Sequence, residues 1–172
     1  VNVVENSGNL EINSSTITAK GGYAVNNKDG NILSDGNGII SSTSNYALYI
    51  LNNNKMSVGN IIITGSNGVQ VNSPTIFNGT KFNMSSNAYG IYGNSDVEAE
   101  NITMIGNYES NGYETNGIYM KNGKLTLKNA ELTNSKIQLD SNTTGEIVGG
   151  SATTLHTTLY SKASKLTING AK

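Results

Sequence analysis

The sequence predicts an all-β fold, a right-handed parallel β-helix (β-solenoid) of about seven coils, with roughly 22 residues and three short strands in each coil. Three observations lead to this prediction. A short motif recurs along nearly the whole chain, apolar and polar residues alternate in short runs, and Asn or Gly separates those runs. Alternation with period 2 is typical of strands, and Asn and Gly tolerate the left-handed backbone of sharp corners.

The most regular motif is a small residue followed by an aliphatic one, usually preceded by Tyr or Asn. Its clear copies are Tyr23-Ala24-Val25, Tyr46-Ala47-Leu48, Asn67-Gly68-Val69, Tyr89-Gly90-Ile91 and Asn116-Gly117-Ile118. The series continues at Ile137 and Leu159, and successive aliphatic residues are 23, 21, 22, 27, 19 and 22 positions apart. We therefore expect these aliphatic residues to occupy the same inward position in successive coils.

A second motif lies between these points and reads apolar, any, apolar, any, then Asn, Ser or Thr. Clear copies start at Leu10, Met56, Val97 and Leu125, and weaker ones at Ile32, Ile76, Ile147 and Leu166. The polar residues that end such runs predict corners that stack from coil to coil: Ser14, Asn60, Thr80, Asn101, Asn129 and Ser151. Two interpretations stay open, a ladder of bonded side chains along the axis or residues that simply make turns.

The composition fits one domain with a thin core. The 172 residues are 35% hydrophobic with a net charge of −1, so low hydrophobicity is not accompanied by the high charge typical of disorder. We expect residues 1–172 to form a single β-solenoid segment, a fragment of a longer repeat protein, because neither end has a recognisable capping element. No segment approaches the roughly 20 apolar residues of a membrane span.

The charged residues and the absence of Cys exclude several classes of site. The eleven basic residues are all Lys and are scattered singly, which argues against a nucleic-acid partner. The absence of Cys excludes disulfides and thiolate metal sites.

An enzyme that shares this fold needs converging carboxylates or a bound Ca²⁺. The four Asp, at positions 29, 35, 96 and 140, fall in different coils, and Asp29-Gly30 and Asp35-Gly36 are ordinary turn dipeptides. The single His156 has no evident partner and is expected at the surface. We therefore expect no catalytic residue, no metal and no cofactor.

One position after each inward aliphatic residue the side chain is expected to point outward, since faces alternate along a strand. Those positions are Asn26, Tyr49, Gln70, Tyr92, Tyr119, Gln138 and Tyr160. This aromatic and amide stripe is a candidate binding surface, because Tyr offers a rigid area with a polar end. The alternative is that the stripe stabilises the solenoid by stacking between strands.

The coil between Ile91 and Ile118 is about five residues longer than the others. The excess falls within residues 106–115, which we expect to leave the stack as a loop. Insertions in repeat arrays are often on the binding face. This makes Tyr108, Glu109, Tyr113 and Glu114 candidate binding residues, with a neutral insertion as the alternative.

The phrases at 87–94 (NAYGIYGN), 115–120 (TNGIYM) and 125–130 (LTLKNA) resemble repeats in the passenger domains of bacterial autotransporters, the type V secretion proteins. The similarity is greatest to the Asn-rich outer-membrane adhesins of the fusobacterial type. The resemblance covers nearly the whole chain, but its motifs specify a solenoid better than a family, and they carry over no functional residue.

What the resemblance implies is a non-catalytic passenger at the bacterial cell surface, exported through a C-terminal outer-membrane β-barrel that this chain lacks. Its partners would be a protein or glycan on host cells or other bacteria, and its ends would stack on neighbouring solenoid segments. The alternatives are a purely structural stalk, a Gram-positive anchored adhesin, a polysaccharide-processing enzyme or phage tailspike, and a vacuolating-toxin-like passenger.

Overall fold

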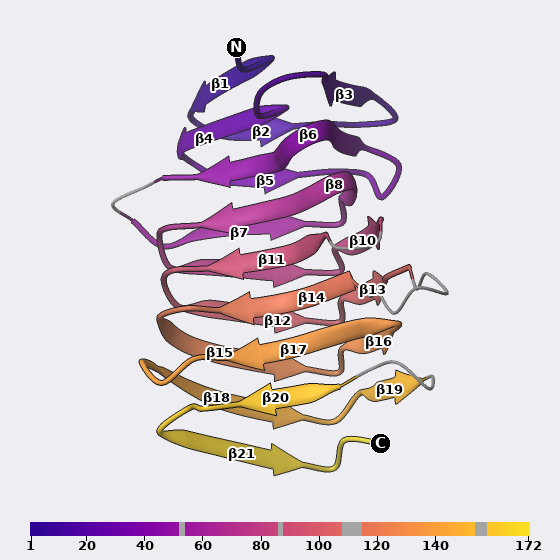
Figure 1. Cartoon of the computed structure of the whole chain (residues 1–172). Helices are drawn as coiled ribbons and strands as arrows, with labels where there is room; N and C mark the ends of the chain where they lie inside the picture. The colour runs from indigo at the N-terminus through magenta and orange to yellow at the C-terminus, as the bar shows by residue number, and fades with distance from the viewer. Residues whose placement is uncertain (52–53, 86–87, 108–114, 154–157) are drawn as a thin grey trace.

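A computed structural model describes residues 1–51, 54–85, 88–107, 115–153 and 158–172. The described residues form twenty-one β-strands and no helix, wound into a stack of coils (Figure 1). Strands in front run to the left and strands behind run to the right as the chain descends, so the solenoid is right-handed (Figure 1). The predicted fold class is confirmed. Within these residues no helix is long and apolar enough to cross a membrane.

The strands form three columns, to which successive coils contribute in turn, and strands within a column pair in parallel. The first column contains β1 (Val4–Ser7), β4 (Val25–Asp29), the end of β6 (Ile39–Ile50), the end of β8 (Ile62–Val71), β11 (Tyr89–Gly93), β14 (Thr115–Met120), β17 (Ser135–Leu139) and β20 (Leu159–Ser161). The second contains β2 (Leu10–Glu11), β5 (Ile32–Leu33), β7 (Met56–Gly59), β9 (Thr75–Asn78), β12 (Val97–Glu100), β15 (Gly123–Lys128), β18 (Thr143–Val148) and β21 (Lys165–Asn169). The third contains β3 (Thr16–Ala19), the starts of β6 and β8, β10 (Lys81–Met84), β13 (Thr103–Ile105), β16 (Glu131–Thr133) and β19 (Ser151–Thr153).

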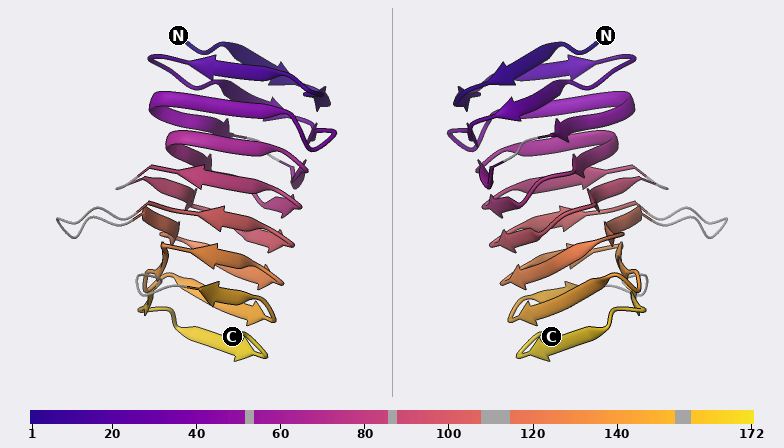
Figure 2. Two further views of the ribbon diagram at one scale, coloured as in Figure 1. Left: turned by 90° about the vertical axis from the view of Figure 1, so that its right-hand side faces the viewer. Right: turned by 90° about the vertical axis from the view of Figure 1, so that its left-hand side faces the viewer.

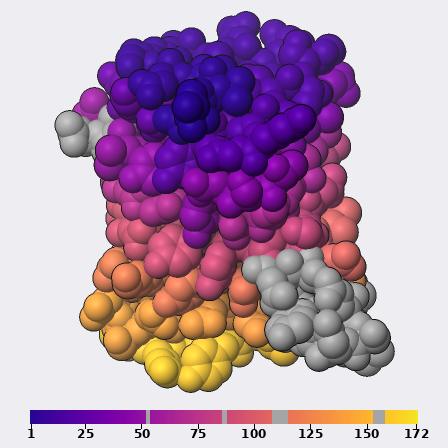
Figure 3. Space-filling model, turned by 45° about the horizontal axis from the view of Figure 1, so that its top comes forward, coloured from indigo at the N-terminus to yellow at the C-terminus, as the bar shows by residue number. Residues whose placement is uncertain are grey.

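The three columns make two sheets, because β6 and β8 run through the corner between the third column and the first. The second column is an 8-stranded sheet, and the other two join into a 13-stranded sheet. The side views show the strands of successive coils lying one above another along the whole stack (Figure 2). Their side chains close into a continuous rod surface (Figure 3).

The pairing register confirms the aliphatic series expected from the sequence. Val25 pairs with Leu48, Leu48 with Val69, and Val69 with Ile91. The row then continues from Ile91 through Ile118 and Ile137 to Leu159. All of these side chains are buried except Leu159, which is 42% exposed.

The row passes directly from Ile91 to Ile118. Most of the predicted loop at 106–115 lies outside the described residues. Thr115 closes the base of the insertion: its backbone N–H donates to the Asn107 carbonyl at 3.1 Å, and its hydroxyl donates to the Ser85 carbonyl at 2.8 Å.

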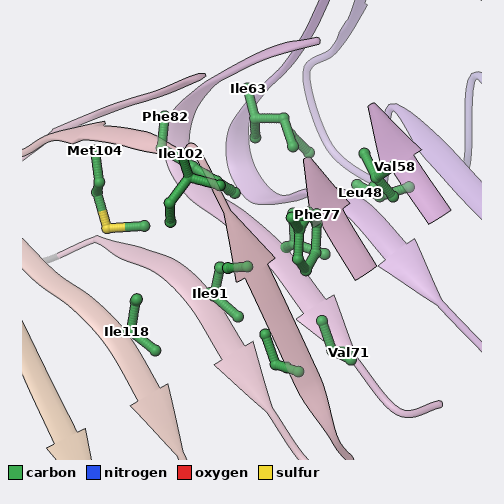
Figure 4. Close-up of a cluster of buried hydrophobic side chains, with 14 of the residues drawn as sticks. Leu48, Val58, Ile63, Val71, Phe77, Phe82, Ile91, Ile102, Met104 and Ile118 are labelled. Carbon is green, nitrogen blue, oxygen red and sulfur yellow. The ribbon is translucent and has the colours of Figure 1, made fainter. Parts of the chain in front are cut away.

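Facing rows fill the interior of the stack. The second column contributes Val58 and Phe77, and the third contributes Ile63, Phe82 and Met104 (Figure 4). The Phe77 and Phe82 rings meet edge to face, with centroids 5.9 Å apart. Each coil supplies only a few apolar side chains, so they become buried only because the coils above and below cover them.

The corner after the second column is a row of residues with positive φ, between 49° and 66°. Its members are Asn60, Gly79, Asn101, Asn129, Gly149 and Gly170. Their backbones form a ladder, since the N–H of each coil donates to the coil below, as from Asn101 to the Lys128 carbonyl at 2.9 Å. Asn and Gly occupy this row because they adopt the left-handed conformation at the least cost.

Three of the predicted corner residues belong to this row, Asn60, Asn101 and Asn129, but the prediction was wrong for Thr80 and Ser151. Gly79 and Gly149 occupy those corners instead, and the Thr80 side chain, one position after Gly79, is buried. Ser14 also has a positive φ, 44°, but lies in the longer corner of the first coil.

The turn interpretation of the corner Asn residues fits better than the side-chain ladder. A Cβ added to Gly79 would lie 2.4 Å from Asn60 Oδ1, and one added to Gly149 would lie 2.6 Å from Asn129 Oδ1. The Asn side chains therefore pack against a Gly of the next coil, and the described residues of this row do not bond to one another through their side chains.

Steric crowding between neighbouring coils explains why the first motif has a small residue before the aliphatic one. In β11 both Gly90 and Ile91 are buried, and the register shifts there, so the strand bulges toward the interior. Neighbouring backbones come close at this bulge: a Cβ on Gly68 would lie 2.2 Å from the Gly90 carbonyl oxygen. Only a very small residue fits.

Gly68→Ala is therefore expected to destabilise the chain by about 1–3 kcal/mol, because the added methyl group forces two coils apart. Gly21→Ala is the matched control, since a Cβ there meets nothing within 4 Å. We expect it to stay within about 0.5 kcal/mol of the unchanged protein. Urea unfolding of both variants measures the difference, and equal stabilities would contradict the close approach of the coils.

Candidate binding face

The outward row of the first column contains the residues expected from the sequence. Parallel pairing puts Asn26, Tyr49, Gln70, Tyr92, Tyr119, Gln138 and Tyr160 in one line along the rod. Tyr160 is 51% exposed, and the other six are half-buried. The predicted binding residues of the stripe thus lie together, on one face of the 13-stranded sheet.

Three further tyrosines, Tyr23, Tyr46 and Tyr89, join this face and were missing from the predicted site. Each lies three positions before a member of the outward row, which in a regular strand would place it on the opposite face. The inward bulge buries two consecutive residues and so returns the flanking residues to the same side, as the burial of β11 shows. The signal in the sequence was the spacing of Tyr89 and Tyr92 around the small-aliphatic pair.

We give the name Tyr face to the six tyrosines whose rings each contact at least one other Tyr ring: Tyr23, Tyr46, Tyr49, Tyr89, Tyr92 and Tyr119. Tyr23 and Tyr49 stack with centroids 4.5 Å apart and 16° between the rings.

The other four rings form a second group centred on Tyr92. Tyr89 and Tyr119 stack at 5.8 Å, and Tyr92 meets both at steep angles, at 5.5 and 5.3 Å. Tyr46 lies 6.2 Å from Tyr92. Aromatic pairs of this geometry contribute about 0.5–1.5 kcal/mol each, so the Tyr face supports the stack as well as offering a surface.

Burial raises the pKa of Tyr23 in the Tyr face, and two further hydroxyls of this face have pKa values raised to about 12. The Tyr119 hydroxyl donates to Asp140 Oδ2 at 2.7 Å, and this bond, with burial and the nearby negative charge, raises the pKa of Tyr119 to about 12. Burial is the main cause that raises the pKa of Tyr46 to about 12. Both phenols therefore stay neutral donors over the physiological pH range.

Amide side chains lie between and beside the rings. Asn94 Nδ2 donates to Asn72 Oδ1 at 2.8 Å, one coil away, and Asn67 Oδ1 accepts the Tyr89 backbone N–H at 3.1 Å. Gln70 Nε2 reaches Asn72 Oδ1 at 3.5 Å. Within the described part of the chain the Gln138 side chain makes no hydrogen bond. The face thus combines ring surface with amide donors and acceptors.

Charged residues concentrate on the 8-stranded sheet instead. Glu98 pairs with Lys128 at 2.7 Å and with Lys55 at 3.6 Å, and Lys124 pairs with Glu146 at 2.9 Å. The bond from Lys128 is the main cause that lowers the pKa of the Glu98 carboxyl. A shallow hollow lies on this side, and its lining includes Lys55, Asp96, Glu98 and Lys124. The positive and negative charges of this side balance, so it is not a strong site for either sign.

The four aspartates lie in separate hydrogen-bonded settings. Asp29 and Asp35 make turns: Asp29 accepts the Gly30 N–H at 2.8 Å, and Asp35 accepts the Ser14 hydroxyl and the Asn37 N–H. The bond from Ser14 is the main cause that lowers the pKa of Asp35. Asp96 accepts the Lys124 N–H at 2.8 Å. Among the described residues, no three acidic or His side chains could hold a metal ion together.

Some predicted site residues cannot be placed. Tyr108, Glu109, Tyr113 and Glu114 of the insertion lie outside the described residues, as does His156. Their role stays a prediction.

Comparisons with known proteins add no family. No protein-family model matches the chain, and neither a curated protein nor a solved structure was found to match it. The resemblance to autotransporter passengers therefore rests on the sequence motifs alone.

Asp140→Asn is expected to lower the pKa of Tyr119 from about 12 toward the ordinary value near 10. A raised pKa stabilises the folded chain fully below pH 10, and this contribution is lost as the pH rises through 12. The absorbance of tyrosinate during an alkaline titration measures the change. Tyr46 should still titrate late, because burial causes its shift, and Asp96→Asn is the control. A titration curve unchanged by Asp140→Asn would contradict the bond.

Proposed function

We propose that this chain is a rigid, non-catalytic segment of a bacterial cell-surface protein of the autotransporter adhesin type, and that it contributes to attachment through the Tyr face. The observation that carries the proposal is the gathering of six tyrosines, with amides between them, on one side of the rod. Tyrosine is common in recognition surfaces because it gives contact area at a low cost in side-chain entropy.

The solenoid supports this role by its rigidity. Seven coil steps of about 4.8 Å make a rod of about 34 Å. Interlocked rows hold each ring in place, so little conformational freedom is lost when a partner binds. The attached partner would be a protein or a glycan on a host cell or another bacterium, and the segment would lie outside the cell, anchored to the outer membrane by the full-length protein.

A purely structural stalk is the second candidate, and a specific observation favours it. The ring contacts join residues of different coils, such as Tyr92 with Tyr119. Stacking of this kind stabilises the rod whether or not a partner binds.

The test compares the attachment of coated beads to host epithelial cells and to other bacteria. The unchanged chain should bind, and the triple variant Tyr49→Ser, Tyr92→Ser, Tyr119→Ser should lose binding by about tenfold or more, because ring area on the face is removed. The control Lys124→Ser, Glu146→Ser changes the 8-stranded sheet and should bind as the unchanged chain does. Circular dichroism must first show that every variant is folded.

No attachment by the unchanged chain, or equal attachment by the triple variant, would contradict the proposed function. Either result would favour the stalk.

A further inference from the structure

We propose that the ligand of the Tyr face is an uncharged glycan chain that lies along the solenoid axis. This inference rests on the proposed attachment function and names the chemistry of what is bound. Charge, surface chemistry and shape support it independently of one another.

The Tyr face has no charged residue in its central rows. From Asn26 to Gln138 the outward row holds only Tyr and amide side chains. The preceding row is uncharged at Tyr23, Tyr46, Asn67, Tyr89 and Asn116, and its next member, in the coil of Gln138, is Lys136. Sialylated or sulfated glycans and acidic peptides are held by Arg or Lys, which these two rows lack in the coils that carry the six rings. The face is therefore matched to a neutral partner.

The charges at the edge of the face do not change this balance. Lys121 and Asp140 follow Met120 and Leu139, which pair in neighbouring coils, and they have opposite signs. Asp140 Oδ2 also accepts a hydrogen bond from the Tyr119 hydroxyl at 2.7 Å. Among the described residues, Lys28 pairs with Glu5 beside Asn26, at the N-terminal end of the face, and the other ion pairs lie on the 8-stranded sheet.

The chemistry of the surface matches that of a sugar. A pyranose ring presents C–H groups on its faces, which pack on aromatic rings, and hydroxyls on its rim, which both donate and accept hydrogen bonds. Tyr rings and Asn or Gln amides offer the same combination, because each amide has a donor and an acceptor. Gln70 and Gln138 flank Tyr92 and Tyr119 in the outward row and supply such amides.

The shape of the face indicates a chain rather than a single sugar. The rings from Tyr23 to Tyr119 span four coil steps, about 19 Å at 4.8 Å per coil. Small-molecule sites are concave and bury most of their ligand, whereas this face is the outer side of a sheet. An extended chain contacts several coils at once, so its affinity grows with the number of sugars that reach the rings.

The experiment measures binding of the whole chain to neutral glucose, galactose and N-acetylglucosamine oligosaccharides of two, four and six units, with sialylated and sulfated glycans beside them. The unchanged chain should bind neutral oligosaccharides, at least tenfold more tightly at six units than at two. Tyr92→Ser should reduce binding about tenfold or more, while Lys124→Ser, on the 8-stranded sheet, should change it less than twofold.

Gln70→Lys and Gln70→Glu form the decisive pair, because they place opposite charges at the centre of the face and leave every ring in place. A neutral ligand is expected to respond to both in the same direction, with two- to fivefold weaker binding. An anionic ligand would bind Gln70→Lys more tightly and Gln70→Glu more weakly, which would overturn the proposal.

A failure of the glycan proposal can be distinguished from a failure of the proposed attachment function by treating the target cells with periodate, which oxidises glycans. Tyr-dependent attachment that survives periodate oxidation of the target cells, with no oligosaccharide bound, would indicate a protein receptor and would overturn the glycan while attachment stands. Tyr-dependent attachment that periodate abolishes would support both.

Discussion

The parallel backbone hydrogen bonds between successive coils are the interaction on which the rest of the structure depends. They set each residue above its equivalent, so every position of the repeat becomes a row along the axis. Aliphatic rows then fill the interior, and a row of positive-φ Asn and Gly forms the corner after the second column. The same bonds require the backbones to approach closely, which explains why a small residue precedes the aliphatic one.

Equivalent residues also align in rows at the surface of the solenoid, and this alignment determines the shape of the candidate site. Because Tyr49, Tyr92 and Tyr119 share one position of the repeat, pairing alone brings residues far apart in sequence together. The same rule collects Lys and Glu on the 8-stranded sheet, where they neutralise one another. The surface thus has an aromatic side, with no charge in the rows between its six rings, and a charged side, and only the first has the properties that we propose for binding.

The rows with strict spacing could be predicted from the sequence, and the local departures from regular strands could not. The aliphatic series from Val25 to Leu159 and the outward row after it were predicted, because residues 19–27 apart repeat the same type. Thr80 was misplaced because Gly79, which has no side chain to mark the pattern, occupies the corner. Tyr89 was missed as a site residue because an alternating strand turns it inward, whereas the bulge turns it outward. The continuity of β6 and β8 through a corner likewise has no marker in the repeat.

The central claim is that successive coils lie in register with parallel pairing, and nuclear Overhauser contacts between backbone protons test it most directly. We expect the Ile91 strand to show contacts to Val69 on one side and to Ile118 on the other, in the parallel pattern, with no contacts between strands joined by a short turn. Antiparallel contacts between strands that follow one another in the sequence would contradict the account.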